Sequence, residues 1–468
     1  MEVTKPPSIP NRKVRTSMLQ HNSLSDHYQS QVSFLFSTLK VGQILRSAGI
    51  RKAYGVSSFA VFQILFQLVF QGRNLFRMLQ SPRGETLPGK DVIYRFLNEP
   101  CYNWRRFYQS LSLKVVSRFE SLTSARRIRV FIIDDSVMSR QRSKKVELLA
   151  RIYDHASGHF VRGYTLLTLG WSDGYSFAPL DFTLMSSAHA KNRLCEMRQD
   201  LDKRTLAYKR RQESMLPKPD VVVDMLKRAL NAGFSADYVL MDSWFTQAPL
   251  LQKLKGQNLH VIGMVKELKQ RYIFNGESLS LGELYAKIPK TTKTEILGSA
   301  RVETPNGMGL KIVFVQNRNN RREWLALLTT DLALDDDEII RIYGMRWSIE
   351  TFFKMAKSHL KLGTEFQGRS FDMMISHTTL VFTRYLLLEW ERRENKDERS
   401  LGGLFYLFAD EVADIDLKTA LKQLMVFVMD LLTDKSRENE ALLCQLQNWI
   451  SDLPRYIKAL FAQVKCES

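Results

Sequence analysis

The segment 342–357 carries four polar residues whose types suit phosphodiester chemistry. They are Tyr343, Arg346, Glu350 and Lys357. At about 3.6 residues per turn, they fall on one face of a helix. Its cations could hold a phosphate, and its carboxylate could bring a metal ion to it. The plainer interpretation is that Arg346 and Glu350 form an ordinary ion pair four residues apart and that Tyr343 belongs to the core.

Two aspartates that follow apolar runs extend this constellation. Residues 129–133 and 236–241 are typical of short strands, which are expected to stop at Asp134 and Asp242. If these strands are neighbours in a sheet, both carboxylates emerge at one edge, and the helix bearing Glu350 can lie across them. Three carboxylates this close repel one another unless divalent cations neutralise them. Oxygen-only ligands favour Mg²⁺, with Mn²⁺ as a substitute, and two such ions about 3.5–4 Å apart can catalyse phosphoryl transfer.

The first aspartate has a neighbour that spacing does not distinguish from it. A lone aspartate at a strand end is usually a turn cap, and Asp134 is followed directly by Asp135. Because side chains alternate along a strand, only one of the two faces the site. We choose Asp134, which stands two residues before the hydroxyl of Ser136.

The composition predicts a soluble globular protein of two to four domains with a polyanionic partner. Of the 468 residues, 44% are hydrophobic and 25% are charged, and 68 basic residues against 49 acidic ones give a net charge of +19. Such an excess favours nucleic acid, through phosphate contacts and counterion release. A ribosomal or membrane-surface protein could share it.

Other signals argue against several protein classes. The most apolar stretches, 56–70 and 378–390, are interrupted by polar residues, so no membrane span is expected. The first residues lack the apolar run of a signal peptide. The cysteines have no CxxC pair, which argues against a zinc or disulfide framework and favours a reducing cytoplasm. They are Cys101, Cys195, Cys444 and Cys466.

The elements that must position the acidic residues change along the chain. Residues 1–25 are expected to form a loose arm. Residues 27–120 have helical periodicity with interleaved arginines, which predicts a helix-turn-helix-like DNA reader or, alternatively, a plain helical scaffold. Acidic residues at 335–338 favour the start of the helix that carries Glu350. Further strands are expected at 148–153, 160–170 and 259–265, a charged helical region at 188–225, a small inserted β domain at 266–333, and helices from 370 to 468.

The order Asp134, Asp242, Glu350, together with the signature of Tyr343, Arg346, Glu350 and Lys357, resembles the DDE transposases of bacterial insertion sequences. It is most similar to their cut-and-paste family with a β insertion before the glutamate, over roughly residues 126–370. The resemblance implies an α/β, ribonuclease-H-like fold with a mixed five-stranded sheet whose first three strands are antiparallel. The implied parts are a helical DNA-binding domain at 1–125, a catalytic domain at 126–265 and 336–395, a β insertion at 266–335 and a helical C-terminal region at 396–468.

The resemblance also implies a role for each matching residue. Two Mg²⁺ ions would be held by Asp134, Asp242 and Glu350. The transposon end would be bound by Tyr343, Arg346, Lys354 and Lys357. Trp324 occupies the place of a tryptophan that receives a base flipped out of a DNA hairpin, because stacking on an indole offsets unstacking. Its alternative is a buried strand tryptophan.

Basic clusters and histidines elsewhere are weaker signals. The clusters agree with the net charge, although each alone is more typical of a solvated face. They are Arg140, Arg142, Lys144 and Lys145; Lys209, Arg210 and Arg211; and Arg318, Arg321 and Arg322. The spacing of His155, His159 and His189 fits no metal or general-base motif, so these are expected to be turn or surface residues.

The sequence therefore predicts a DNA transposase that excises and integrates an insertion sequence by two-metal phosphoryl transfer. The expected steps are end nicking, hairpin formation and resolution, and strand transfer. The expected partners are double-stranded transposon ends and target DNA, with a homodimer in the synaptic complex and helices such as 417–432 as a candidate interface. The expected location is the bacterial cytoplasm, at the nucleoid. The alternatives are a nuclease of the same fold that does not join strands, and a catalytically silent DNA-binding relative.

Overall fold

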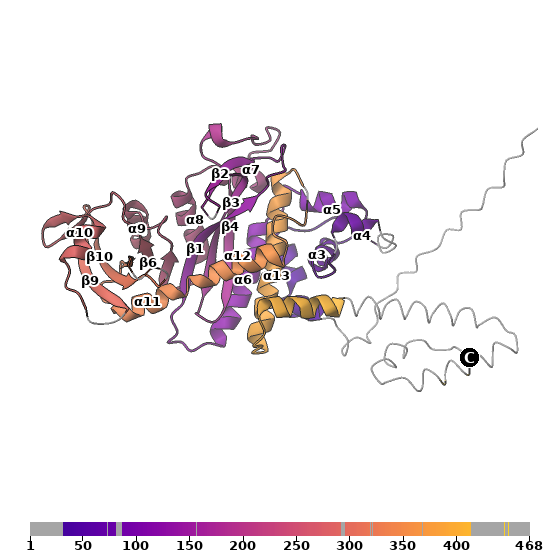
Figure 1. Ribbon diagram of the computed structural model, residues 1–468. Coiled ribbons are helices and arrows are strands. Elements are labelled where there is room, and N and C mark those ends of the chain that lie inside the picture. Colours follow the sequence, from indigo (N-terminus) through magenta and orange to yellow (C-terminus); the bar gives the residue numbers. More distant parts are fainter. Residues whose placement is uncertain are drawn as a thin grey trace, which may run out of the picture.

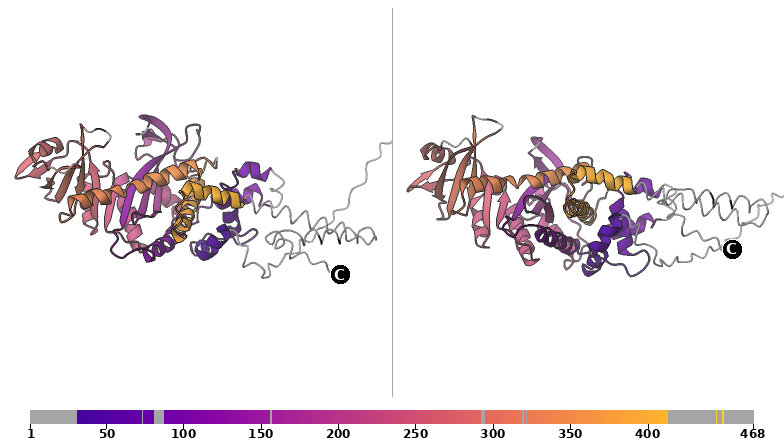
Figure 2. Two further views of the ribbon diagram at one scale, coloured as in Figure 1. Left: turned by 60° about the horizontal axis from the view of Figure 1, so that its bottom comes forward. Right: turned by 90° about the horizontal axis from the view of Figure 1, so that it is seen from below.

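The structure is a computed structural model that describes residues 31–412, apart from 73, 81–86, 156, 292–294, 319, 321 and 367, together with 444 and 448. The described part is elongated, with helices at one end, a mixed sheet in the middle and a β-rich lobe at the other end (Figures 1 and 2). The arm expected at 1–25 and the candidate dimer segment at 417–432 lie outside the described residues.

The region before the sheet is helical, as its periodicity predicts. Side chains of Ser57, Asn74 and Asn103 cap three of its helices by accepting hydrogen bonds from backbone N–H groups. Its buried apolar residues share one hydrophobic core with the sheet. The helix-turn-helix interpretation stays a prediction. The described helices are α1 (Gln31–Thr38), α2 (Val41–Ser47), α3 (Ser58–Gln67), α4 (Leu75–Leu79), α5 (Lys90–Leu97) and α6 (Trp104–Ser121).

The sheet runs in the order β2-β3-β1-β5-β6-β11-β10-β9-β7-β8, and β4 also pairs with β3. Strands β1, β3 and β4 pair antiparallel, whereas β5 and β6 run parallel to β1. The chain is thus a mixed α/β protein, and the expected adjacency of the two aspartate-bearing strands is confirmed. The bounds are β1 (Val130–Ser139), β2 (Ala150–Asp154), β3 (His159–Ser172), β4 (Phe177–Met185), β5 (Tyr238–Met241), β6 (His260–Val265), β7 (Tyr272–Phe274), β8 (Glu277–Leu279), β9 (Ile296–Glu303), β10 (Gly309–Gln316) and β11 (Trp324–Thr329).

Three parts of the sheet differ from the expectation. Strand β1 does not stop at Asp134, because it pairs with β3 as far as Ser139 although its pairing with β5 ends at Ile133. Strand β4 was not predicted. The strands of the β insertion expected at 266–335 are continuous with the main sheet, a connection that the sequence does not predict, because β11 pairs with β6. Helix α10 (Leu281–Lys287) covers β7 and β8 in the lobe at the left of Figure 1.

The remaining helices flank the sheet. The segment 186–205 is largely irregular rather than helical. Helix α13 is buried along almost its whole length and contacts α3, α5, α6, α12 and β4. It therefore joins the N-terminal helices to the sheet. The bounds are α7 (Leu206–Ser214), α8 (Lys218–Asn231), α9 (Ala248–Lys255), α11 (Asp336–Gly344), α12 (Trp347–Ser358) and α13 (Phe371–Glu394), with a 3₁₀ turn at Ala190–Asn192.

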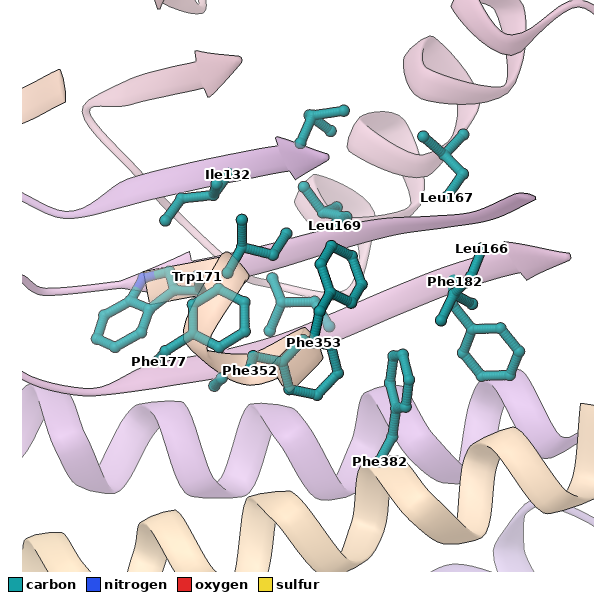
Figure 3. Close-up of a cluster of buried hydrophobic side chains, with 14 of the residues drawn as sticks. Ile132, Leu166, Leu167, Leu169, Trp171, Phe177, Phe182, Phe352, Phe353 and Phe382 are labelled. Atoms are coloured by element: carbon teal, nitrogen blue, oxygen red, sulfur yellow. The ribbon is translucent and has the colours of Figure 1, made fainter. Parts of the chain in front are cut away.

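Helix α12 is anchored by aromatic packing on the side that faces the core. The Phe352 ring lies 5.4 Å from that of Phe177, 4.9 Å from that of Phe382 and 4.7 Å from that of Tyr385, measured between centroids. Figure 3 shows Phe352 and Phe353 among the side chains between the sheet and the helices. Such packing of buried rings fixes the helix against the sheet and so sets where its polar residues lie.

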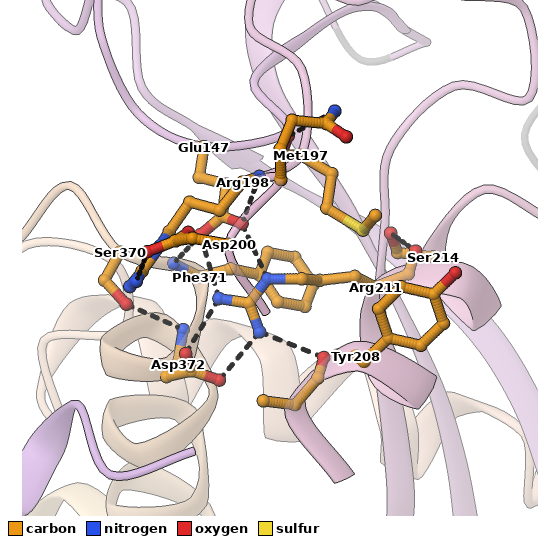
Figure 4. Close-up of polar contacts among 12 residues, drawn as sticks. Glu147, Met197, Arg198, Asp200, Tyr208, Arg211, Ser214, Ser370, Phe371 and Asp372 are labelled. Carbon is orange, nitrogen blue, oxygen red and sulfur yellow. Dashed lines mark hydrogen bonds and ion pairs between the residues drawn. The ribbon is translucent and has the colours of Figure 1, made fainter. Parts of the chain in front are cut away.

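The basic cluster at 209–211, which alone is more typical of a solvated face, is largely buried. Arg211 is fully buried and donates hydrogen bonds to Glu147, at 2.6 and 2.9 Å, and to Asp372, at 2.9 and 2.7 Å (Figure 4). Arg210 is also buried, and only Lys209 is exposed. Paired carboxylates compensate the Arg211 charge, so this residue holds the fold together and does not face DNA.

Among the described helices, none has the length and apolar character needed to cross a membrane. Cys101, Cys195 and Cys444 are free thiols. Cys466 lies outside the described residues.

Candidate active site

One cavity brings together the three predicted acidic residues. It has a volume of about 480 Å³ and lies at the edge of the sheet where β1 and β5 diverge and where α12 crosses. Asp134, Asp242 and Glu350 all line it. The other residues that line it are Asp135, Ser136, Ser243, Met264, Lys266, Tyr343, Arg346 and Phe353.

Asp134 faces α12 across this cavity. Its Oδ2 accepts a hydrogen bond of 3.1 Å from Arg346, and its Oδ1 accepts one of 2.8 Å from the backbone N–H of Asp135. Burial raises the pKa of Asp134 to about 7, because the Arg346 charge that lowers it is outweighed and Asp242 adds repulsion. The carboxyl is therefore poorly compensated when it is ionised.

Asp242 is held in a turn that packs closely on β6. Its Oδ1 accepts a hydrogen bond of 3.0 Å from the backbone N–H of Trp244, and Thr246 Oγ1 donates to the Met264 carbonyl at 2.8 Å. A Cβ at Gly263 would lie 2.4 Å from the Thr246 methyl carbon, so only glycine allows this approach. Burial also raises the pKa of Asp242, although the Trp244 N–H opposes it.

The four signature residues, expected on one face of a single helix, are divided between two helices. Helix α11 ends at Gly344 and α12 begins at Trp347, with Arg346 as its N-cap. Arg346 donates a hydrogen bond of 3.1 Å to Asp134 and one of 2.5 Å to Glu350, so its guanidinium bridges two of the three acidic side chains. The predicted pair of Arg346 and Glu350 exists, but it lies inside the cavity and not on a solvated face.

Tyr343 is half-buried, and its hydroxyl is the least satisfied polar group of the signature. Within the described residues its Oη is buried without a hydrogen-bond partner. The Arg346 guanidinium carbon lies 5.7 Å from its ring centroid. Burial raises the pKa of Tyr343 to about 12, against the lowering by Arg346. An unpartnered hydroxyl at a polar cavity can donate to an oxygen of an incoming ligand.

Asp135 has a different partner from Asp134. Its Oδ2 accepts a hydrogen bond of 2.6 Å from Lys218, at the start of α8. The Lys218 amine also lies 4.6 Å from the ring centroid of Trp244. Asp134 therefore contacts Arg346, whereas its neighbour Asp135 contacts Lys218. Both carboxylates line the cavity, so the choice of Asp134 stays a prediction.

The other predicted DNA contacts lie outside the cavity. The Lys357 amine donates to Ser136 Oγ at 2.6 Å. Lys354 is exposed one turn earlier on α12. Trp324 is half-buried among Tyr285 and Phe314, whose ring centroids lie 5.2 and 5.1 Å away. Its packing agrees with the plainer interpretation of a strand tryptophan, and a base-receiving role stays a prediction.

The remaining basic clusters and the histidines lie mostly on the surface. Arg142, Lys144 and Lys145 are exposed, whereas Arg140 is partly buried and donates to the Phe366 carbonyl. Arg318 is exposed and pairs with Glu295 at 3.0 Å, Arg322 is exposed, and Arg321 lies outside the described residues. His155, His159 and His189 are exposed, as expected for turn or surface residues.

Sequence reasoning missed two basic residues at the site. Lys266 lines the cavity directly after β6, and Lys218 pairs with Asp135. The position of Lys266 after an apolar strand is the same signal that indicated Asp134 and Asp242. The pairing of Lys218 spans 83 residues of sequence and has no local signal.

The donor chemistry of the cavity fits a hard divalent cation. In the described part of the chain, no group of three or more His, Cys, Asp or Glu side chains is arranged to hold a metal ion. Arg346 lies between Asp134 and Glu350. The acidic donors are carboxylate oxygens, and burial raises the pKa of both Asp134 and Asp242, so a bound cation would stabilise their ionised forms.

Two family models match parts of the chain that contain the acidic residues. Residues 66–275 match the family described as "DDE superfamily endonuclease", and residues 217–387 match the family described as "Transposase DDE domain". No curated protein matches. The chain is similar to the "Drosophila P element transposase strand transfer complex" with 11% identity over 56% of each chain, so it spans about half of that chain. The TM-score of 0.21 is too low to establish a shared fold. Each family model matches less than half of the chain, and the two matched segments together include Asp134, Asp242 and Glu350.

Proposed function

We propose that this protein is a DNA transposase of an insertion sequence, with a ribonuclease-H-like catalytic fold. The observation that carries the proposal is the meeting of Asp134, Asp242 and Glu350 at one cavity from three separate elements. The strand directions of β4-β3-β1-β5-β6 support the fold assignment. The net charge of +19 supports DNA as the partner.

The acidic residues would hold the metal, and the basic residues would hold DNA. Asp134, Asp242 and Glu350 would hold two Mg²⁺ ions, which when bound activate a water or 3′-hydroxyl and stabilise the leaving oxygen. Arg346 donates to two of these carboxylates, and with a metal held there its guanidinium would be available to a phosphate oxygen. Tyr343, Lys354, Lys357 and Lys266 supply further donors on or beside the cavity.

The reaction consists of successive phosphoryl transfers at one site. Water attacks a phosphodiester at the transposon end and releases a 3′-hydroxyl. That hydroxyl attacks the opposite strand to form a hairpin, which a second water opens. The same hydroxyl then attacks target DNA, and each attack releases one 3′-oxygen as the leaving group. Trp324 would receive a flipped base during the hairpin steps. A bacterial, nucleoid-associated homodimer would hold the two ends.

The test measures nicking and joining of DNA that carries the sequences flanking the gene. Glu350→Gln should lower Mg²⁺-dependent nicking by about a thousandfold or more, because several kcal/mol of transition-state stabilisation is lost. Binding of the duplex should remain. Glu338→Gln is the matched control, since Glu338 lies on α11 and pairs with Arg341 three residues later, outside the cavity. Equal nicking by both variants would remove Glu350 from catalysis.

A second arm separates transposition from hydrolysis. Precut ends are supplied with a target plasmid, and joined products are measured. A transposase gives joined products that Glu350→Gln abolishes. A nuclease of the same fold gives cleavage without joining, and that result would contradict the transposase proposal.

A further inference from the structure

The outward face of the hairpin formed by β2 and β3 combines two arginines with two aromatic rings. In the strand register Arg151 stands opposite Arg162, and Tyr153 stands opposite Phe160. All four side chains are exposed, with Tyr153 at 45% and Phe160 at 55%. We define these four residues as the hairpin patch.

The arginines of the hairpin patch are not neutralised. Within the described residues, neither Arg151 nor Arg162 forms an ion pair with a carboxylate, and the Arg151 guanidinium carbon lies 4.7 Å from the centroid of the Phe160 ring. Like charges directly opposite on antiparallel strands destabilise a sheet. The pair therefore weakens the hairpin in isolation, and an anionic partner would remove that penalty.

The hairpin patch lies on the same face of the sheet as Asp134. Directly paired residues share a face, and side chains alternate along each strand. Asp134 pairs with Thr168 and Ser136 pairs with Leu166, so even-numbered residues of β3, including Phe160 and Arg162, lie on the Asp134 face. The pairing of β2 with β3 places Arg151 and Tyr153 there too. This is the face that α12 crosses.

Lys357 lies between the cavity and the hairpin. Its amine donates to Ser136, two residues beyond Asp134 on β1. Desolvation lowers the pKa of Lys357, and the nearby charge of Asp154, at the end of β2, partly offsets this. Asp134, Lys357 and Arg162 therefore lie in this spatial order along the strand direction of β1 and β3.

The spacing along that direction suits a nucleic-acid backbone. Arg162 lies six positions along β3 from Thr168, the partner of Asp134. At about 3.3 Å per residue this is roughly 20 Å. With about 3.4 Å between successive phosphates along the helix axis, the hairpin patch is about six nucleotides from the phosphate at the acidic cavity.

We propose that the hairpin patch binds the phosphate backbone of duplex DNA about six nucleotides from the reacting phosphate. This rests on the proposed function, because it assumes that the cavity holds that phosphate. The guanidinium groups of Arg151 and Arg162 bind phosphate oxygens, and Tyr153 and Phe160 stiffen the hairpin and pack against the sugar edge. The duplex is either the transposon end or the target, since both present the same backbone.

The test compares two double variants of the full-length protein, without divalent metal so that no cleavage occurs. The double variant Arg151→Ala with Arg162→Ala should bind a duplex about tenfold more weakly. The negative slope of the log association constant against log salt concentration should become shallower by about 1.8, since two phosphate contacts are lost. Arg126→Ala with Arg127→Ala is the control. It removes the same charge from exposed positions before the other end of β1. An equal change of slope in both variants would overturn the proposal.

Photo-cross-linking locates the contact directly. Benzoylphenylalanine in place of Phe160 should cross-link DNA, whereas the same residue in place of Leu122, which is 43% exposed after α6, should not. No cross-link from position 160 would also overturn the proposal.

Activity arms identify the duplex and separate this proposal from the proposed function. If the Arg151 and Arg162 double variant loses nicking, the bound duplex is the transposon end. If it nicks normally and loses joining of precut ends, the bound duplex is the target. If nicking and joining both persist at wild-type levels while Glu350→Gln abolishes them, the hairpin proposal fails and the proposed function stands.

Discussion

Two regions of the molecule bury carboxylates against an arginine, with opposite electrostatic results. In the network around Arg211, one guanidinium donates to both oxygens of Glu147 and both of Asp372. Although burial raises the pKa of Glu147, hydrogen bonds and charge from Arg211 outweigh it, and the pKa is lowered. At the cavity, Arg346 reaches one oxygen each of Asp134 and Glu350, and the pKa of Asp134 is raised to about 7.

The difference separates a structural ion network from a site whose carboxylates are only partly compensated. A buried charge stabilises a fold only when its partners satisfy it fully. The Arg211 network meets this condition with four charge-assisted hydrogen bonds. The cavity does not, because the acids there outnumber the contacts that Arg346 makes. The acids of the first region therefore stabilise the fold, and those of the second are suited to a ligand.

Removal of the arginine should affect the two regions very differently. Arg211→Met leaves Glu147 and Asp372 buried without their cation, so it should lower the free energy of unfolding by about 3–5 kcal/mol. Arg346→Met should lower it by less than half as much, because the cavity is open to water and the Asp134 carboxyl can take up a proton. Urea unfolding followed by circular dichroism measures both. Similar losses in the two variants would show that the cavity is as closely satisfied as the network.

The two regions should also respond to pH in opposite directions. The pKa of Glu147 is lowered by folding, so its contribution is complete above the unfolded value of about 4.3 and is lost as pH falls through the folded value. The pKa of Asp134 is raised to about 7, so its ionisation costs stability as pH rises from about 4 to about 7. The expected effect of Asp134 is on the order of 4 kcal/mol, because its pKa is raised from about 4 to about 7.

Urea unfolding in a metal chelator, from pH 4 to pH 8, measures these contributions. Asp134→Asn should flatten the decline between pH 4 and pH 7, whereas Glu147→Gln should flatten only the acid limb. A decline of equal size in Asp134→Asn and the wild type would show that Asp134 does not carry the raised pKa.

The sequence predicted the meeting of the acids because the signal was local. Apolar runs ending at Asp134 and Asp242 become parallel neighbours, and a short polar signature places Arg346 and Glu350 within one turn. Strand β4 was missed because Pro179 and Asp181 interrupt its pattern. Pro179 lies at the register shift between β3 and β4, where a missing N–H is tolerated. Asp181 is buried against Arg105 and Arg228.

Other misses share a non-local cause. Arg211 pairs with residues 64 and 161 positions away, so its burial has no signature in its own segment. The pairing of β11 with β6, which joins the 266–335 segment to the main sheet, is equally remote. Lys218 reaches Asp135 across 83 residues. Local periodicity predicts elements and their ends, whereas these contacts are fixed only when the sheet is assembled.

The central claim is that Asp134, Asp242 and Glu350 bind divalent cations together. Titration of the full-length protein with Mn²⁺, with free Mn²⁺ measured by electron paramagnetic resonance, tests it most directly. The account predicts saturable binding that Mg²⁺ displaces, that Asp134→Asn and Glu350→Gln each remove, and that Asp135→Asn and Glu147→Gln retain. Binding that survives in Asp134→Asn and Glu350→Gln, or its absence from the wild type, would contradict the account.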